Sequence, residues 1–78
     1  MPTYRLTAHT AKETLVHVVH YEWQSIAPHY KTAKEFVANH MPGYELCSTG
    51  RQEPGNVYRF EAVNYNKQVG ATLWVREI

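Results

Sequence analysis

The prediction of the fold depends on whether the stretch "YRLTAHTAKETLVHVVHYEW", residues 4–23, forms a helix or strands. The tetrapeptide Thr-Ala-Lys-Glu in its middle occurs again in "KTAKEFVANHMPG", residues 31–43. In both copies a threonine stands three residues before a glutamate, which is the spacing of a helix capping box. The chain therefore starts either two helices at these positions, or one helix and one tight turn.

The residues after the first copy have the composition of a strand. On a helical wheel their apolar side chains gather on one side, so a helix over residues 11–26 is the alternative, and it would give the order βααβββ. However, residues 14–23 are rich in β-branched and aromatic side chains, which pack well on a pleated sheet and crowd a helix. The composition thus favours the strand.

Strand pairing supports the same interpretation. Residues 4–9 alternate between apolar and polar side chains, and a hairpin closed around residues 10–13 makes the two apolar faces coincide. The pairs are Ala8–Leu15, Leu6–His17 and Tyr4–Val19. Four-residue hairpin loops are commonly built around a type I turn, whose backbone is locally helical. We therefore predict that the first Thr-Ala-Lys-Glu is a turn, and that Trp23 lies toward the core.

The second copy is followed by the apolar spacing of a helix. Its apolar face consists of Ala33, Phe36, Val37 and His40, at i, i+3, i+4 and i+7. Thr32 can cap the first turn, and Met41-Pro42-Gly43 ends the run, because proline disfavours helix in the preceding residue. We predict one short helix of about ten residues, over residues 32–40.

The rest of the chain alternates as strands do. We expect a strand over residues 44–49, a turn over 51–56, and a second hairpin whose strands, 57–64 and 69–78, flank the loop 65–68. The predicted pairs are Asn64–Val69, Ala62–Ala71, Phe60–Leu73 and Tyr58–Val75. The predicted fold is α+β, with an antiparallel sheet of about five strands and one helix in the order ββαβββ. From the length of the chain we expect residues 1–78 to form a single compact domain.

Composition excludes several classes of protein. The net charge is only +1, so any nucleic-acid site needs its cations gathered on one face. Cys47 is the single cysteine, which excludes an intrachain disulfide and favours a cytoplasmic location. The start has no apolar segment behind a basic head, and no apolar run has the length of a membrane span, so we expect neither a signal peptide nor a membrane partner.

The sequence carries no catalytic signature. His17 and His20 have the spacing of an H-x-x-H metal site, but on a strand they point to opposite faces. Cys47 lacks a glycine-rich oxyanion element and an orienting carboxylate, and phosphate-binding loops are absent from the sequence. We expect no enzyme, no catalytic residue, no cofactor and no metal ligand.

One short helix cannot cover such a sheet. A ten-residue helix is about 15 Å long and ~10 Å wide, whereas five strands span roughly 20–24 Å. The uncovered face should carry Arg5, Arg59, Trp74 and Arg76, with Arg59 opposite Trp74 and close enough for a cation–π contact. Tryptophan and arginine are enriched at binding hot spots. The alternative is that Trp74 shields the backbone by packing on Val16 and Val18.

A second candidate surface is the tip of the later hairpin. Tyr65, Asn66 and Lys67 combine an aromatic ring, an amide and a cation in its loop. Such a group could contact a protein or a nucleic acid, although loop-tip residues of this kind are more often simply solvated.

In element order the chain resembles the very small phage-encoded inhibitors known as anti-CRISPR proteins. The resemblance covers the whole chain as architecture: a first hairpin over residues 4–8 and 15–23, the helix over 32–40, and closing strands over 44–78. No residue motif is matched, so no functional residue is carried over. The resemblance implies a non-enzymatic inhibitor that covers a protein surface or a nucleic-acid-binding groove of a host nucleoprotein complex.

Three functions follow as expectations. The first is a small non-enzymatic binding protein that occludes a macromolecular partner, more readily a protein or ribonucleoprotein than free nucleic acid. Its contacts would be Arg5, Arg59, Trp74, Arg76 and the loop residues Tyr65, Asn66 and Lys67. The alternative is a direct nucleic-acid-binding module, whose affinity would fall steeply with salt. A third is a structural homodimer formed through sheet faces or edge strands.

Overall fold

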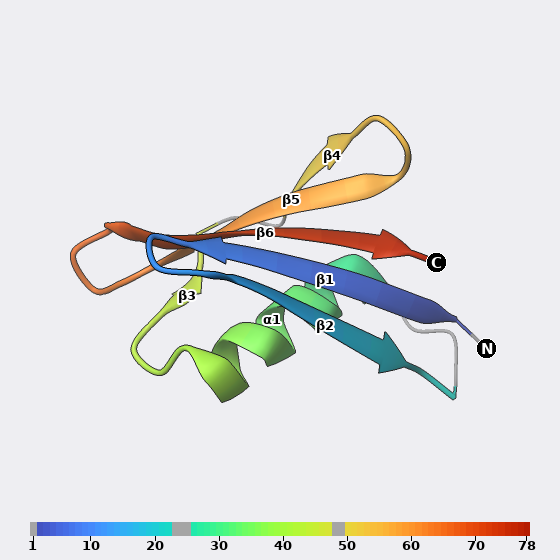
Figure 1. The fold of residues 1–78 in the computed structure, drawn as a ribbon, viewed down its shortest axis with the longest axis horizontal. Coiled ribbons are helices and arrows are strands. Elements are labelled where there is room, and N and C mark those ends of the chain that lie inside the picture. The colour runs from blue at the N-terminus through green and yellow to red at the C-terminus, as the bar shows by residue number, and fades with distance from the viewer. Residues whose placement is uncertain (1, 23–25, 48–49) are drawn as a thin grey trace.

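The structure is a computed structural model that describes residues 2–22, 26–47 and 50–78. Within them, one helix packs on one face of a six-stranded antiparallel sheet (Figure 1), so the predicted α+β fold is confirmed. The elements are β1 (Thr3–Thr10), β2 (Thr14–His20), α1 (Pro28–His40), β3 (Glu45–Leu46), β4 (Arg51–Glu53), β5 (Val57–Val63) and β6 (Val69–Glu77). The strand order is β2-β1-β6-β5-β3, and β4 also pairs with β5.

The first hairpin has the predicted register. Leu6 lies opposite His17, and the other predicted pairs are also present. Thr10 organises the turn with its hydroxyl group, which accepts hydrogen bonds from the N–H groups of Lys12 and Glu13 at 3.2 and 3.0 Å. The helical alternative is therefore wrong for β2. Trp23, predicted to lie toward the core, is outside the described residues.

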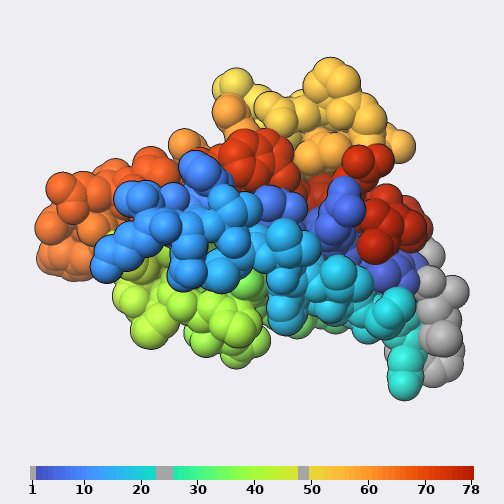
Figure 2. Space-filling model, in the orientation of Figure 1, coloured from blue at the N-terminus to red at the C-terminus, as the bar shows by residue number. Residues whose placement is uncertain are grey.

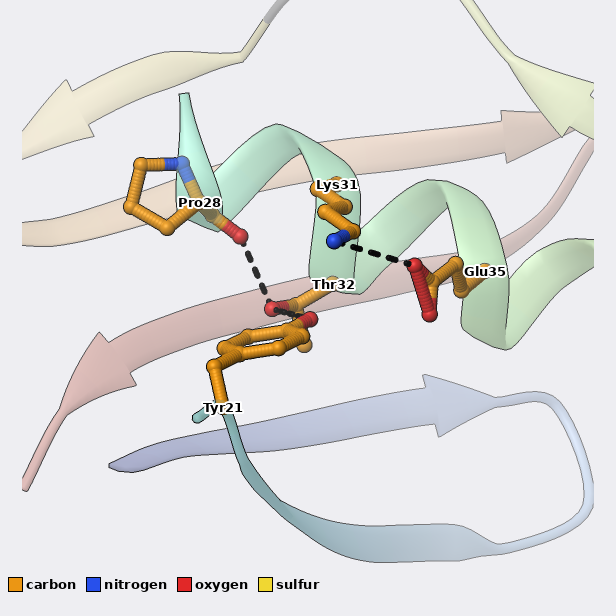
Figure 3. Close-up of polar contacts among 5 residues, drawn as sticks. All are labelled: Tyr21, Pro28, Lys31, Thr32 and Glu35. Carbon is orange, nitrogen blue, oxygen red and sulfur yellow. Dashed lines mark hydrogen bonds and ion pairs between the residues drawn. The ribbon is translucent and has the colours of Figure 1, made fainter. Parts of the chain in front are cut away.

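The helix begins four residues before its predicted cap. Pro28 occupies the first turn, where its missing N–H and fixed φ suit a helix start, and the preceding Ala27 provides no side-chain cap. Thr32 is therefore inside the helix, and its hydroxyl donates to the Pro28 carbonyl at 2.8 Å. Glu35 lies 4.0 Å from Lys31 instead of completing a capping box (Figure 3). The prediction that the second Thr-Ala-Lys-Glu caps a helix is wrong.

Thr32 instead joins the helix to the end of the first hairpin. It is buried, and its hydroxyl is 2.7 Å from the Tyr21 hydroxyl (Figure 3). Because the Thr32 proton is donated to the Pro28 carbonyl, Tyr21 is the donor in this second bond. The pair holds α1 against residues that follow β2 directly.

Replacing Thr32 by valine keeps the side-chain shape and removes both hydrogen bonds. We expect Thr32→Val to lower the free energy of unfolding by about 1–3 kcal/mol, because the partly buried Tyr21 hydroxyl loses its acceptor. Urea unfolding measures this loss. The double variant Tyr21→Phe/Thr32→Val should recover part of it, since no unpaired hydroxyl remains. An unchanged urea midpoint for Thr32→Val would contradict this role.

The core lies between α1 and the sheet face that it covers. Leu6, Leu73 and Val75 of the sheet are completely buried there, against Phe36 and Val37 of the helix. The full cluster is Tyr4, Leu6, Ala8, Ala33, Phe36, Val37, Phe60, Ala62, Ala71, Leu73 and Val75. Its sheet members alternate with residues that face away from the helix, which positions the surface described below.

The second hairpin follows the predicted register up to Ala62–Ala71 and then shifts. Val63, not Asn64, lies opposite Val69, and the irregularity leaves Gly70 as the extra residue. A Cβ atom at Gly70 would overlap the ring of Tyr44. The predicted Asn64–Val69 pair is thus wrong, because a bulge accommodates that ring.

Two other boundaries differ from the prediction. Of the strand expected over residues 44–49, the described residues form Glu45–Leu46, and residues 48–49 lie outside the described part of the chain. The turn expected over residues 51–56 contains β4, so the sheet has one more strand than predicted. The reason is that β3 pairs with just the end of β5, and β4 satisfies the backbone groups at the start of that strand.

Candidate binding surface

All four arginines of the chain lie on the sheet face that points away from α1. Each follows or precedes a residue of the opposite face, so the two-residue period of a strand directs it outward. Together with one tryptophan they form what we call the arginine face: Arg5 of β1, Arg51 of β4, Arg59 of β5, and Trp74 and Arg76 of β6. Figure 2 shows α1 (green) along one side of the strands and the β4–β5 hairpin (yellow and orange) at the other.

The four lysines are distributed differently. Lys31 and Lys34 lie on α1, and Lys12 and Lys67 lie in the two hairpin loops. The arginine face therefore carries a local positive charge in a chain whose net charge is +1. Two carboxylates share this face, from Glu53 and Glu61.

The sheet sets two pairs of arginines directly opposite each other. Arg5 faces Arg76, and Arg51 faces Arg59. Like charges in this position are unfavourable. Arg59 is relieved by Glu53, with Nε 3.9 Å from Oε2, whereas Arg5 and Arg76 have no ion pair with any described residue. The guanidinium groups of Arg5 and Arg76 therefore repel each other, and a bound anion would relieve this repulsion.

Trp74 lies between the two arginine pairs. It is opposite Thr7 on one side and Arg59 on the other, and it is partly buried. The predicted position of Arg59 opposite Trp74 is confirmed. The Arg59 guanidinium, however, forms an ion pair with Glu53 and not the predicted cation–π contact with the indole. A shallow cleft of about 290 Å³ runs beside the indole. It is lined by Arg5, Thr7, Val57, Trp74 and Arg76. Chemically, it can hold a planar ring flanked by anions.

The strand order argues against the alternative that Trp74 packs on Val16 and Val18. Thr7 of β1 separates Trp74 from Val16, because β1 lies between β2 and β6. Val16 and Val18 are 62% and 49% exposed. Trp74 does not bury these valines.

The predicted site residues divide into two groups. Arg5, Arg59 and Arg76 are on one face with Trp74, and their role in binding stays a prediction. Tyr65, Asn66 and Lys67 are at the tip of the β5–β6 hairpin, at the end of β6 far from Arg76 (Figure 1). The structure does not bring the loop to the arginine face.

The loop between β5 and β6 is held by hydrogen bonds within the turn. The Asn64 side chain accepts hydrogen bonds from the N–H groups of Asn66 and Gln68, at 2.9 and 3.0 Å. Lys67 has φ 63° and Tyr65 is 95% exposed. Among the described residues, neither the Tyr65 ring nor the Lys67 cation has a ring contact or an ion pair, so any contact that they make with a partner is separate from the arginine face.

Arg51 belongs to the arginine face although the sequence pattern predicts a turn at residues 51–56. It lies on β4 opposite Arg59. The alternation of Arg51 and Glu53 just before Pro54-Gly55-Asn56 is the signal of a third short hairpin, and it could have located this arginine.

The histidines of β2 lie on opposite faces, as their spacing predicts. His17 is on the helix side, with its ring centroid 5.8 Å from that of Phe36 and 5.6 Å from that of His40. His20 is hydrogen-bonded to Thr3 at 2.7 Å. Among the described residues, no three His, Cys, Asp or Glu side chains are grouped closely enough to hold a metal ion.

His29 has an unusual environment at the start of α1. Its ring lies against Tyr4 and Tyr58, with centroids 5.1 and 4.3 Å apart, and its Nε2 atom is buried without a hydrogen-bond partner among the described residues. Burial lowers the pKa of His29, and the nearby Glu77 carboxylate opposes this effect. The folded protein therefore favours the neutral imidazole.

This lowered pKa makes stability depend on pH. Below the ordinary histidine pKa of about 6.5, the unfolded chain binds a proton that folded His29 resists, so stability is full above that pH and declines as the pH falls. We expect the thermal midpoint to drop between pH 7.5 and pH 5.5, and to drop less in His29→Phe. His9→Gln, at an exposed position, is the control and should behave as wild type. Equal drops in all three proteins would contradict a role for His29.

Comparison of the chain with protein-family models, with curated proteins and with solved structures found no match. None of the described helical segments is long and apolar enough to cross a membrane.

Proposed function

We propose that this protein is a non-enzymatic binding module that covers a macromolecular partner with the arginine face, and that the partner is single-stranded nucleic acid. The observation that carries the proposal is the segregation of charge. All four arginines share the uncovered face with Trp74, while all four lysines lie elsewhere.

Arginine is suited to phosphate in a way that lysine is not. Its planar guanidinium donates two parallel hydrogen bonds to a phosphate and stacks on flat rings. A surface that needed positive charge only for solubility would have no preference for arginine over lysine. The opposed pair Arg5–Arg76, which has no ion pair with any described residue, weakens the free sheet, and a polyanion laid across it would reverse this effect.

The position of Trp74 favours a single strand over a duplex. An aromatic ring on an open sheet is a platform on which an unpaired base can stack, and such stacking tolerates any base. In a duplex the base faces are covered by their neighbours. The cleft beside Trp74, which Arg5 and Arg76 also line, would hold a base on the indole with its phosphates on these two guanidinium groups.

The test is a salt titration with a fluorescein-labelled single-stranded oligonucleotide, followed by fluorescence anisotropy. The logarithm of the binding constant should fall linearly with the logarithm of salt concentration, with a slope of about −2 to −3 for three or four phosphate contacts. In a Trp23→Phe background, stacking should also quench the Trp74 emission. A flat salt response, or unchanged emission at saturation, would contradict the proposal.

A second candidate is occlusion of a protein or ribonucleoprotein, as the resemblance to anti-CRISPR proteins implies. The observation that favours it is the pairing of a partly buried tryptophan with arginines, the residue types that dominate protein hot spots. A partner recovered from nuclease-treated lysate of the source cell, and lost with Trp74→Ala, would support this function over the first. The exposed free thiol of Cys47 agrees with a cytoplasmic setting for either.

A further inference from the structure

Strand β2 forms an edge of the sheet that nothing in the described chain covers. It pairs with β1 alone, and its outer side faces solvent (Figure 1). Its seven residues, Thr14–His20, contain no lysine, glutamate, proline or glycine. Leu15, Val16 and Val18 are 37%, 62% and 49% exposed. A seven-residue edge with exposed apolar side chains is of the kind that pairs with another strand.

The opposite edge of the sheet is protected by the usual devices. It consists of two short pieces, the two-residue β3 and the three-residue β4. These pieces carry charged side chains, from Glu45, Arg51 and Glu53, and Pro54 follows directly. Short, charged and proline-flanked edges resist pairing. The fold thus blocks one edge and leaves the other open.

The backbone of β2 has its free groups at every second residue. In the hairpin, Thr10 N–H donates to the Glu13 carbonyl and Tyr21 N–H to the Pro2 carbonyl. Hydrogen-bonded pairs alternate along an antiparallel ladder, so Leu15, His17 and Val19 are the residues bonded to β1. The N–H and C=O groups that point outward therefore belong to Thr14, Val16, Val18 and His20.

We propose that β2 pairs antiparallel with β2 of a second copy of the chain, with a two-fold axis at His17. In this register the pairs across the axis are Val16–Val18, Leu15–Val19, Thr14–His20 and His17–His17. Every outward backbone group then finds a partner, because Val16 and Val18 exchange hydrogen bonds, as do Thr14 and His20. It is the symmetric register that overlaps all seven residues of the strand.

The sequence of β2 is complementary to itself in this register. Apolar side chains meet apolar side chains on both faces, at Val16–Val18 and at Leu15–Val19. The Thr14–His20 pair repeats a contact that the sheet already makes twice, since Thr3 bonds His20 at 2.7 Å and His9 bonds Thr14 at 3.0 Å.

The two-fold axis runs perpendicular to the sheet, so rotation about it keeps each face on its own side. Both helices would lie on one side of a continuous twelve-stranded sheet, and both arginine faces on the other. The dimer would thereby double the length of the positive surface. The self-pairing of β2 stands independently of what the arginine face binds.

Sedimentation velocity on the full chain, from the low micromolar range to about 1 mM, tests the proposal. Wild type should change from the mass of one chain to that of two. Val16→Lys/Val18→Lys places lysines opposite each other and should raise the dissociation constant about tenfold or more. Val16→Glu/Val18→Lys places opposite charges together and should restore the dimer in this register alone. Ala38→Lys/Gln52→Lys adds the same charge at exposed positions away from β2 and should leave the dimer intact.

A crosslinking experiment checks the register directly. In a Cys47→Ser background, His17→Cys should form a disulfide-linked dimer under mild oxidation, because a self-opposed pair brings the two thiols together. Val16→Cys should crosslink much more slowly. Circular dichroism confirms that each variant is folded. A wild-type chain that stays monomeric throughout, or a dimer that survives Val16→Lys/Val18→Lys, would overturn the proposal.

Discussion

Replacing Arg5 and Arg76 together by glutamine is expected to weaken the binding of single-stranded nucleic acid by about 10- to 100-fold at low salt, as two charged hydrogen-bond donors are removed. The slope of the salt dependence should become shallower by about 1.4, which is 0.7 for each phosphate contact. Fluorescence anisotropy with the labelled oligonucleotide measures both quantities.

The same substitution should not destabilise the fold. Arg5 and Arg76 are exposed and directly opposite each other, so their replacement removes a repulsion and should leave the thermal midpoint equal or slightly higher. Lower affinity with equal or higher stability distinguishes a binding role from a structural one. The matched control is Lys12→Gln/Lys34→Gln, which removes the same charge from exposed positions off the arginine face. Equal losses of affinity in the two double variants would contradict a localised site.

The second large effect is expected at Leu73, the neighbour of Trp74 on β6. Leu73 is completely buried against α1, opposite Phe60 of β5 and Ala8 of β1. Leu73→Ala should lower the free energy of unfolding by about 2–5 kcal/mol, because it leaves a cavity that the sheet cannot close. In a domain of this size that corresponds to a fall in thermal midpoint of about 10–30 °C, measurable by calorimetry.

Trp74→Ala is the matched comparison, one residue further along the same strand. Trp74 faces away from the core, so its removal should change the thermal midpoint far less than Leu73→Ala does. It should instead weaken oligonucleotide binding by about 5- to 150-fold, the value of one stacked base. If Trp74→Ala unfolds as readily as Leu73→Ala, the indole belongs to the core and the binding surface lies elsewhere.

Local patterns were reliable along both hairpins as far as the Ala62–Ala71 pair, where a period and a pairing could be counted. The register from Leu6–His17 in the first hairpin to Phe60–Leu73 in the second was predictable, because a shift of one residue would turn every apolar side chain toward solvent. Arginines flanking those core residues were therefore predictable as outward-facing.

The errors arose where a distant residue outweighed a local motif. Thr32 has the spacing of a cap, but its hydroxyl is used by Pro28 and by Tyr21, from beyond β2. Gly70 is the extra residue of a bulge and lies under the ring of Tyr44, a contact that no count along residues 57–78 reveals. Each of these contacts joins parts of the chain that the sequence separates.

By itself, then, the sequence determined the strands of both hairpins, the presence of one helix, and the face on which the residues of those strands lie outside the bulge, because the two-residue period is a local property. Only the tertiary structure decided which residues of different strands share a surface. The order β2-β1-β6-β5, with β4 also paired to β5, brings arginines from β1, β4, β5 and β6 to one surface around Trp74, and it leaves β2 at an open edge. Strand order depends on long-range pairing, so neither the arginine face nor the self-complementary edge could be located until the sheet was assembled.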